Sequence, residues 1–157
     1  MPDPSRRCLE DFEVGQVIEL GSVEVDEAEM LSFASSYDPQ PIHIDRDAAA
    51  RGAFGGLIAS GWLTGSLFMR LFASTVLNRS AALVSPGLEE LRWLRPVRAG
   101  DVLHGRYEVL AVSPSERDPT RGTVHGRGEL VNQDGEVVLR LVARNLFSRR
   151  SSPGPGP

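Results

Sequence analysis

The segment Ser60-Gly-Trp-Leu-Thr-Gly-Ser-Leu-Phe-Met-Arg-Leu-Phe-Ala-Ser-Thr-Val-Leu77 decides the fold of this 157-residue chain. Its hydrophobic residues recur on nearly every side of the helix that it predicts, and Ser60 is placed to cap the first turn. A helix of this kind has to be covered by other parts of the protein. A membrane span is the alternative, but the segment contains Arg70 and several hydroxyl residues, and no second apolar segment accompanies it. We therefore expect a buried core helix and no membrane partner.

The chain after this helix changes to the alternation that is typical of strands. Four strands are predicted, at residues 87–97, 101–112, 120–132 and 136–147. Gln133-Asp-Gly135 predicts a hairpin turn between the last two. Several long antiparallel strands beside one apolar helix indicate an α+β fold in which a sheet curls around that helix. Because one curved sheet leaves uncovered edges, we also expect a homodimer.

The chain before the helix is predicted to begin with strands and a capped helix. Residues 12–25 are interpreted as a pair of strands, with Gly15 and Gly21 as breaks. Asp26-Glu-Ala-Glu29 has the capping-box pattern and opens a helix that runs to about Ser36.

A second short helix is predicted at residues 45–51, where Asp45 can cap the first turn. The domain organisation follows from where the apolar pattern begins and ends. We expect residues 12–149 to form a single domain, with an N-terminal extension at residues 1–11 and a disordered tail at residues 150–157, which is rich in serine, glycine and proline.

The composition argues against several classes of protein. The formal net charge is −4, and no basic stripe with interleaved aromatic residues is visible, so nucleic acid is not the expected partner. All 17 basic residues are arginine, which excludes a lysine Schiff base and a P-loop lysine. Cys8 is the only cysteine, and Met1 to Glu10 does not have the apolar core of a signal peptide. A cytoplasmic location is therefore expected.

The stretch Tyr37-Asp-Pro-Gln-Pro-Ile-His-Ile-Asp45 holds the residues best suited to chemistry. Its two prolines predict a rigid extended loop, which can bring Asp38 and His43 to one point. Asp45 precedes an alanine-rich segment and can serve as its cap. Asp38 follows a helix, where the dipole disfavours a carboxylate, so it has no comparable structural role. We therefore predict that Asp38 is the partner of His43, although a purely structural histidine is the alternative.

Ser60-Gly61 adds a third element at the start of the apolar helix. A helix N-terminus offers free backbone N–H groups and a positive dipole end, which suit a developing oxyanion. Glycine also lets a substrate carbonyl come close. The simpler interpretation is a helix cap alone. An acid, a base and an oxyanion donor together favour proton transfer next to a carbonyl group.

Two blocks of this sequence resemble the MaoC-like dehydratases, a family of (R)-specific enoyl-CoA hydratases. The first block is Asp38-Pro-Gln-Pro-Ile-His-Ile-Asp45, followed by Phe54-Gly-Gly56 and Ile58-Ala-Ser-Gly-Trp62. The second block is Leu91-Arg-Trp-Leu-Arg-Pro-Val-Arg-Ala-Gly-Asp101. Together they span most of residues 12–147. The resemblance implies a hotdog fold, in which an antiparallel sheet wraps a long helix, pairing into dimers, and no metal or redox cofactor.

The resemblance also implies roles for individual residues. Asp38 and His43 would activate a water that adds across the double bond of a trans-2-enoyl thioester, or that leaves in the reverse direction. The N–H of Gly61 would bind the thioester oxygen. Gln40 stands where the family usually has asparagine, which affects how the loop is held. The acyl chain and its carrier, coenzyme A or acyl carrier protein, stay open.

Three other functions also stay open. His43-Ile-Asp45 with His104 or His125 is similar to the ligand set of non-haem Fe(II) oxygenases, but here the motif leads into helices rather than strands. A non-catalytic hotdog subunit, which binds an acyl thioester or pairs with an active partner, would be expected to lose the acid or the histidine. A hotdog thioesterase needs a carboxylate near the start of the central helix, and residues 60–72 contain none.

Two arginines in the second block have two interpretations. Arg95 and Arg98 could reach the phosphates of a coenzyme A carrier, because guanidinium groups bind phosphate well. The alternative is that they form salt bridges at the end of a strand.

Overall fold

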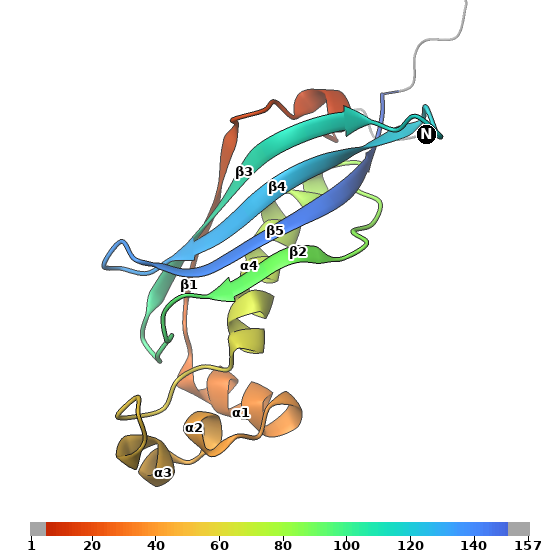
Figure 1. Ribbon diagram of the computed structural model, residues 1–157. Helices are drawn as coiled ribbons and strands as arrows, with labels where there is room; N and C mark the ends of the chain where they lie inside the picture. The colour runs from red at the N-terminus through yellow and green to blue at the C-terminus, as the bar shows by residue number, and fades with distance from the viewer. Residues whose placement is uncertain (1–5, 151–157) are drawn as a thin grey trace, which may run out of the picture.

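The computed structural model describes residues 6–150, and Figure 1 shows a curved sheet lying over one long helix. The three other α-helices of the described residues gather at the end of the molecule where the long helix begins. An antiparallel sheet wrapped around a helix is the hotdog arrangement, so the predicted α+β hotdog fold is confirmed. Apart from Arg150, the predicted disordered tail lies outside the described residues.

Within the described residues, one five-stranded sheet has the strand order β1-β3-β4-β5-β2, and every neighbouring pair is antiparallel. The strands are β1 (Val17–Glu24), β2 (Leu88–Trp93), β3 (Val102–Pro114), β4 (Arg121–Val131) and β5 (Val137–Ser148). The four strands predicted after the helix are confirmed, and so is the turn that joins the last two. Buried residues alternate along β4 and β5, because only one face of the sheet covers the helix.

The prediction of two strands in residues 12–25 is wrong, because the single strand β1 covers this region. β1 pairs with β3, and its register shifts between Glu19 and Gly21. Gly21 has a φ angle of 88°, which glycine adopts without steric cost. The chain therefore passes through a β-bulge at this glycine and continues as the same strand.

The long helix, α4 (Gly61–Thr75), packs one face against the inside of the sheet. Its buried side chains are hydrophobic except for one threonine: Leu63, Thr64, Leu67, Phe68, Leu71 and Phe72. In the single chain, Trp62 and Met69 remain about half exposed. Other parts of this chain therefore do not cover this side of the helix, although the sequence predicts a helix that is buried all round. A short 3₁₀ helix, η2 (Leu77–Arg79), follows. None of the helices in residues 6–150 has the length and apolar character that a membrane crossing requires.

The first and third of the short helices begin as predicted. The side chain of Asp26 accepts a hydrogen bond from the N–H of Glu29 and caps α1 (Glu27–Tyr37). The side chain of Asp45 accepts from the N–H of Ala48, 2.9 Å away, and caps α3 (Arg46–Arg51). Both caps were predictable because donor and acceptor lie only three residues apart.

The second short helix, α2 (Pro41–Ile44), contradicts the prediction of an extended loop up to His43. The extended part ends at Gln40, and Pro41 occupies the first helical position. Proline is accommodated there because the first helical residues need no N–H donor, and its fixed φ angle suits a helix. His43 is therefore presented from a helical turn, where it is buried.

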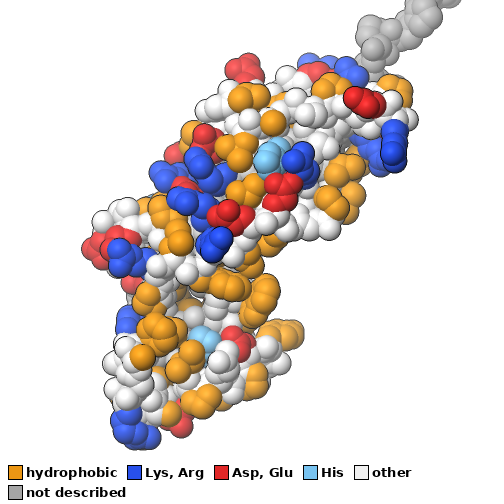
Figure 2. All heavy atoms as spheres, viewed as in Figure 1, with side chains coloured by type: hydrophobic (Ala, Val, Ile, Leu, Met, Phe, Trp, Pro, Cys, Tyr) orange, Lys and Arg blue, Asp and Glu red, His pale blue; other side chains and the backbone are white. Residues whose placement is uncertain are grey.

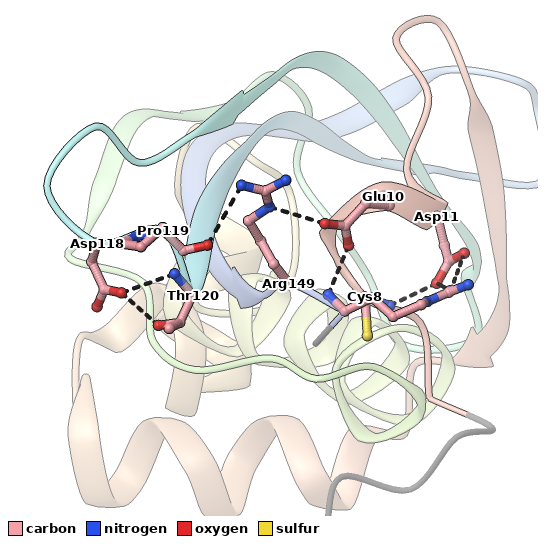
Figure 3. A network of polar contacts seen from close by, with 8 residues as sticks. Cys8, Glu10, Asp11, Asp118, Pro119, Thr120 and Arg149 are labelled. Atoms are coloured by element: carbon pink, nitrogen blue, oxygen red, sulfur yellow. Dashed lines mark hydrogen bonds and ion pairs between the residues drawn. The ribbon is translucent and has the colours of Figure 1, made fainter. Parts of the chain in front are cut away.

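The two ends of the described chain are held together by ion pairs. A 3₁₀ helix, η1 (Leu9–Asp11), buries its leucine in the hydrophobic core. Figure 3 shows Glu10 facing Arg149, whose Nε lies 3.0 Å from the Glu10 carboxylate, and Arg150 pairs with Asp11 at 2.6 Å. The core thus includes one residue of the predicted N-terminal extension.

Candidate active site

Residues from three helical regions meet at a cavity of about 460 Å³. Asp38 directly follows α1, His43 lies in α2, and Gly61 is the first residue of α4. The three candidate residues, Asp38 and His43 from one stretch of sequence and Gly61 from the next long helix, therefore line one space. Figure 2 shows the molecule hollowed between the sheet and the short helices, with hydrophobic side chains around the hollow. The apolar wall includes Phe54, Ile58, Trp62, Trp93 and Leu94.

The imidazole of His43 is buried and held in one orientation. Its Nδ1 lies 2.8 Å from the carbonyl oxygen of Ile58. A carbonyl oxygen only accepts hydrogen bonds, so Nδ1 carries a hydrogen and donates it. The other ring nitrogen, Nε2, lies 3.3 Å from Oδ2 of Asp38. Nε2 is therefore the atom of this ring that can exchange a proton next to Asp38.

The carboxylate of Asp38 is held by two neutral donors. The side-chain amide of Gln40 donates to Oδ1, and the hydroxyl of Ser60 donates to Oδ2, each at 2.7 Å. Hydrogen bonds from Gln40 and then Ser60 lower the pKa of Asp38; partial burial opposes them, and His43 adds a smaller attraction. Asp38 is therefore an ionised carboxylate at neutral pH, with Oδ2 beside His43.

The first peptide of α4 also borders the cavity. Because Gly61 begins the helix, its N–H has no helical carbonyl one turn earlier to bond. The indole Nε1 of Trp93 donates to the carbonyl oxygen of Gly61 at 2.7 Å. A Cβ atom on residue 61 would lie 2.5 Å from the Trp93 ring, so glycine alone fits against the indole. The N–H of Gly61 is therefore a backbone donor at the edge of the cavity, directed away from the helix.

The two arginines of the second sequence block have different surroundings. Arg95 lines the cavity and pairs with Glu136 at 3.2 Å, as the salt-bridge interpretation predicts. Arg98 donates instead to the carbonyl oxygens of Phe54 and Leu57. Arg98 therefore holds the segment just before Ile58, the residue whose carbonyl oxygen orients His43.

The ligand set of the iron alternative is not brought together. Asp45 caps α3, and His125 pairs with Glu89 at 2.8 Å on the sheet. His104 is exposed on β3. Among residues 6–150, no group of three or more histidine, cysteine, aspartate or glutamate side chains is arranged to hold a metal ion.

Sequence reasoning does not identify two contacts of Asp38. Ser60 is predicted as a helix cap, and its oxygen does accept from the N–H of Trp62 at 3.3 Å. Its hydrogen is directed to Asp38, which lies 22 residues earlier in the chain. Gln40 is visible in the sequence as a departure from a family pattern, but nothing there says that its amide reaches Asp38.

Comparison with known proteins finds consistent relatives. The family model described as MaoC like domain matches residues 11–127. The chain is 30% identical over 141 residues to the 3-hydroxybutyryl-CoA dehydratase of Methylorubrum extorquens, covering 88% of this chain and 87% of that protein. It is 31% identical over 134 residues to the (R)-specific enoyl-CoA hydratase of Aeromonas caviae, covering 84% and 97%. Both alignments include the cavity residues.

One solved structure adds to these relatives. The crystal structure of the MaoC-like dehydratase from Rhodospirillum rubrum superimposes with a TM-score of 0.86 at 40% sequence identity. The superposition covers 92% of this chain and 99% of that chain. The similarity therefore extends over the sheet, α4 and the short helices together.

Proposed function

Because this chain belongs to the MaoC-like domain family, we propose that it is a hydratase or dehydratase that adds water to, or removes water from, a trans-2-enoyl thioester. The observation that carries the proposal is the separation of 3.3 Å between Asp38 Oδ2 and His43 Nε2 at the wall of the cavity. A water molecule that contacts both atoms has a base and an acid beside it. The relatives' activities on coenzyme A thioesters support the same class of substrate.

The protons of the hydration reaction balance within this pair. One member takes a proton from water, the resulting hydroxide forms a bond to C3 of the enoyl group, and the other member gives a proton to C2. The proton gained by the first member then returns to the second, which 3.3 Å between Oδ2 and Nε2 permits. Dehydration is the same sequence reversed. No electrons are transferred, so neither direction calls for a redox cofactor, and the proposal includes no metal.

The thioester oxygen acquires negative charge while water adds to C3. We assign its stabilisation to the N–H of Gly61, supported by the positive end of the α4 dipole. Trp93 holds the backbone next to this N–H, because its indole donates to the carbonyl oxygen of the same residue, Gly61. The apolar wall of the cavity suits the acyl chain, because most of its side chains offer no hydrogen bonds.

A homodimer and a cytoplasmic location are part of the proposal. The exposed Trp62 and Met69 of α4 and the edge strand β2, with Leu88 and Trp93 exposed, form apolar surface that a second copy would cover. Light scattering at micromolar concentration should give twice the mass of the chain; a monomer would contradict this assembly. The single cysteine supports a reducing compartment.

An absorbance assay tests the reaction directly. Crotonyl-CoA and longer or branched enoyl thioesters should lose the absorbance of their conjugated double bond when the protein is added. Chiral analysis of the product should give the (R)-3-hydroxyacyl thioester, and an (S) product would contradict the proposed stereochemistry. A chelator should leave the rate unchanged. Thioester binding without turnover by any substrate would instead favour the non-catalytic subunit.

A further inference from the structure

Gln40 makes two hydrogen bonds back to the residue two positions earlier. Its backbone N–H donates to the carbonyl oxygen of Asp38 at 2.8 Å, and its side-chain amide donates to Oδ1 of Asp38 at 2.7 Å. Pro39, between them, has a fixed φ angle and no N–H. The three residues therefore form a compact unit at the end of α1, in which the side chain of Gln40 folds over the carboxylate.

This arrangement distinguishes the two oxygens of Asp38. Oδ1 is occupied by Gln40, whereas Oδ2 accepts from Ser60 and lies beside His43. A carboxylate with a donor on only one oxygen can rotate about its C–C bond. With a donor fixed on each oxygen, the plane of the group is set and Oδ2 is kept next to the imidazole.

We propose that Gln40 is a positioning residue for the reaction, which holds the carboxylate of Asp38 so that Oδ2 faces the water and His43. The role rests on the proposed hydratase function, because it acts through Asp38. Gln40 itself lines the cavity and is exposed, so its polar side chain is not explained by a need to fill the core. The hydrogen bond to Asp38 is the contact that its amide makes in the described structure.

The amide also affects ionisation. The bond from Gln40 is the largest of the contributions that lower the pKa of Asp38. The titratable and charged groups near this carboxylate are few: His43 faces it from α2, and Arg95 lines the same cavity from the chain between β2 and β3. Without the amide, Asp38 should take up a proton at higher pH, so the acid limb of the pH profile should move upward.

Three substitutions separate positioning from a general structural effect. Gln40→Leu removes the donor, Gln40→Glu replaces it with a charge that repels Asp38, and Gln40→Asn keeps an amide on a shorter side chain. Gln133→Leu is the matched control, because Gln133 also donates to an aspartate, Asp101, but does not line the cavity. The kcat, the KM, the pH profile and the melting temperature of each variant are measured.

Gln40→Leu should lower kcat at neutral pH about ten-fold, since misplacement of a reacting group costs on that order or more. Its KM and melting temperature should stay near those of the unaltered protein, and its acid limb should move to higher pH. Gln40→Glu should lose more, and Gln40→Asn should recover part of the rate. Gln133→Leu should change the melting temperature but neither kcat nor the acid limb. An unchanged kcat and acid limb in Gln40→Leu would overturn the proposal.

Carbon NMR of the Asp38 carboxyl group keeps this test separate from that of the proposed function. The Asp38 signal is assigned by its loss in Asp38→Asn and is titrated in the unaltered protein and in Gln40→Leu. A higher titration midpoint in Gln40→Leu supports the contact even if no enoyl thioester is turned over, in which case only the hydratase assignment fails. Identical midpoints would overturn the role of Gln40 whatever the activity.

Discussion

Glu129 and Asp38 are carboxylates with little exposure to solvent, and they differ in the charge of their partners. Glu129, on the central strand β4, is bound by Arg106 of β3 and Arg140 of β5, with Nε to oxygen distances of 2.8 Å on both sides. The strand register places these two arginines directly opposite Glu129. Asp38, at the cavity, is bound instead by the neutral donors of Gln40 and Ser60.

The difference determines what each group can do. Burial alone would raise the pKa of Glu129, but the guanidinium groups of Arg106 and Arg140 hold it below its usual value. Two permanent cations neutralise that charge, so Glu129 stabilises the sheet. Figure 2 shows basic and acidic side chains side by side over this sheet. The donors on Asp38 keep it ionised without cancelling its charge. That charge remains available to His43 and to a bound water.

The largest expected effect is the loss of turnover when Asp38 is changed. Asp38→Asn keeps the shape but removes the charge and the ability to accept a proton. General acid–base groups commonly contribute about 10² to 10⁴-fold, so kcat should fall on that scale. The melting temperature should change little, because Asp38 caps no helix start. His43→Ala should fall as far, and the double variant little further, since the two residues act as one unit.

Independent, additive losses in the double variant would contradict a coupled pair. An unchanged kcat in Asp38→Asn would contradict the distinction between the two carboxylates, because Asp38 would then take no more part in the reaction than Glu129.

The second prediction applies the opposite test to the sheet. Glu129→Gln leaves two arginines without their counter-charge and should lower the free energy of unfolding by about 1–3 kcal/mol. The kcat of the folded protein should stay unchanged, since Glu129 does not line the cavity. Urea unfolding at neutral pH gives the stability, and the enoyl-thioester assay gives kcat. A large loss of kcat with unchanged stability would reverse the roles assigned to the two carboxylates.

The pH dependence of that stability difference has a defined sign. The pKa of Glu129 is lower in the folded chain than the ordinary value of 4.5. Its charge therefore stabilises the fold fully above about pH 4.5 and loses this contribution as the pH falls through the folded value. The difference in unfolding free energy between the unaltered protein and Glu129→Gln should shrink on acidification. A difference that grows at low pH would contradict the ion-pair account.

Local patterns predicted most of the fold, because their causes are local. The apolar helix and the alternating strands follow from periodicity within a segment, and the caps at Asp26 and Asp45 need a donor only three residues away. Two predictions, a strand break near Gly21 and an extended loop through Pro41, were wrong because each residue type permits two structures. Gly21 indicates a break or a bulge equally well, and Pro41 can extend a loop or begin a helix.

Contacts between distant segments could not be predicted from single stretches of sequence. Residue type and dipole arguments selected Asp38, His43 and Gly61, and the structure brings these three to one cavity. The hydroxyl of Ser60 reaches Asp38 only because the end of α1 and the start of α4 meet in three dimensions. The pairing of Glu129 with two arginines likewise depends on the register of three strands.

A third carboxylate, that of Asp45, gives the smallest expected effect. It tests whether a carboxylate that is close to His43 in sequence takes part in the reaction. Asp45 lies two residues after His43, yet it is exposed and accepts from the N–H of Ala48 at 2.9 Å. Asp45→Ala should lower the unfolding free energy by about 1 kcal/mol, the usual value of a helix cap, and leave kcat of the folded protein nearly unchanged.

Asp45→Ser is the matched control, because serine also caps helices and should restore most of the stability without a carboxylate. Both variants are measured by urea unfolding and by the enoyl-thioester assay. Proximity in sequence favours Asp45 as the partner of His43, whereas the distances in the structure favour Asp38. If Asp45→Ala and Asp45→Ser both lose activity while Asp38→Asn does not, the assignment of Asp38 to the reaction is wrong.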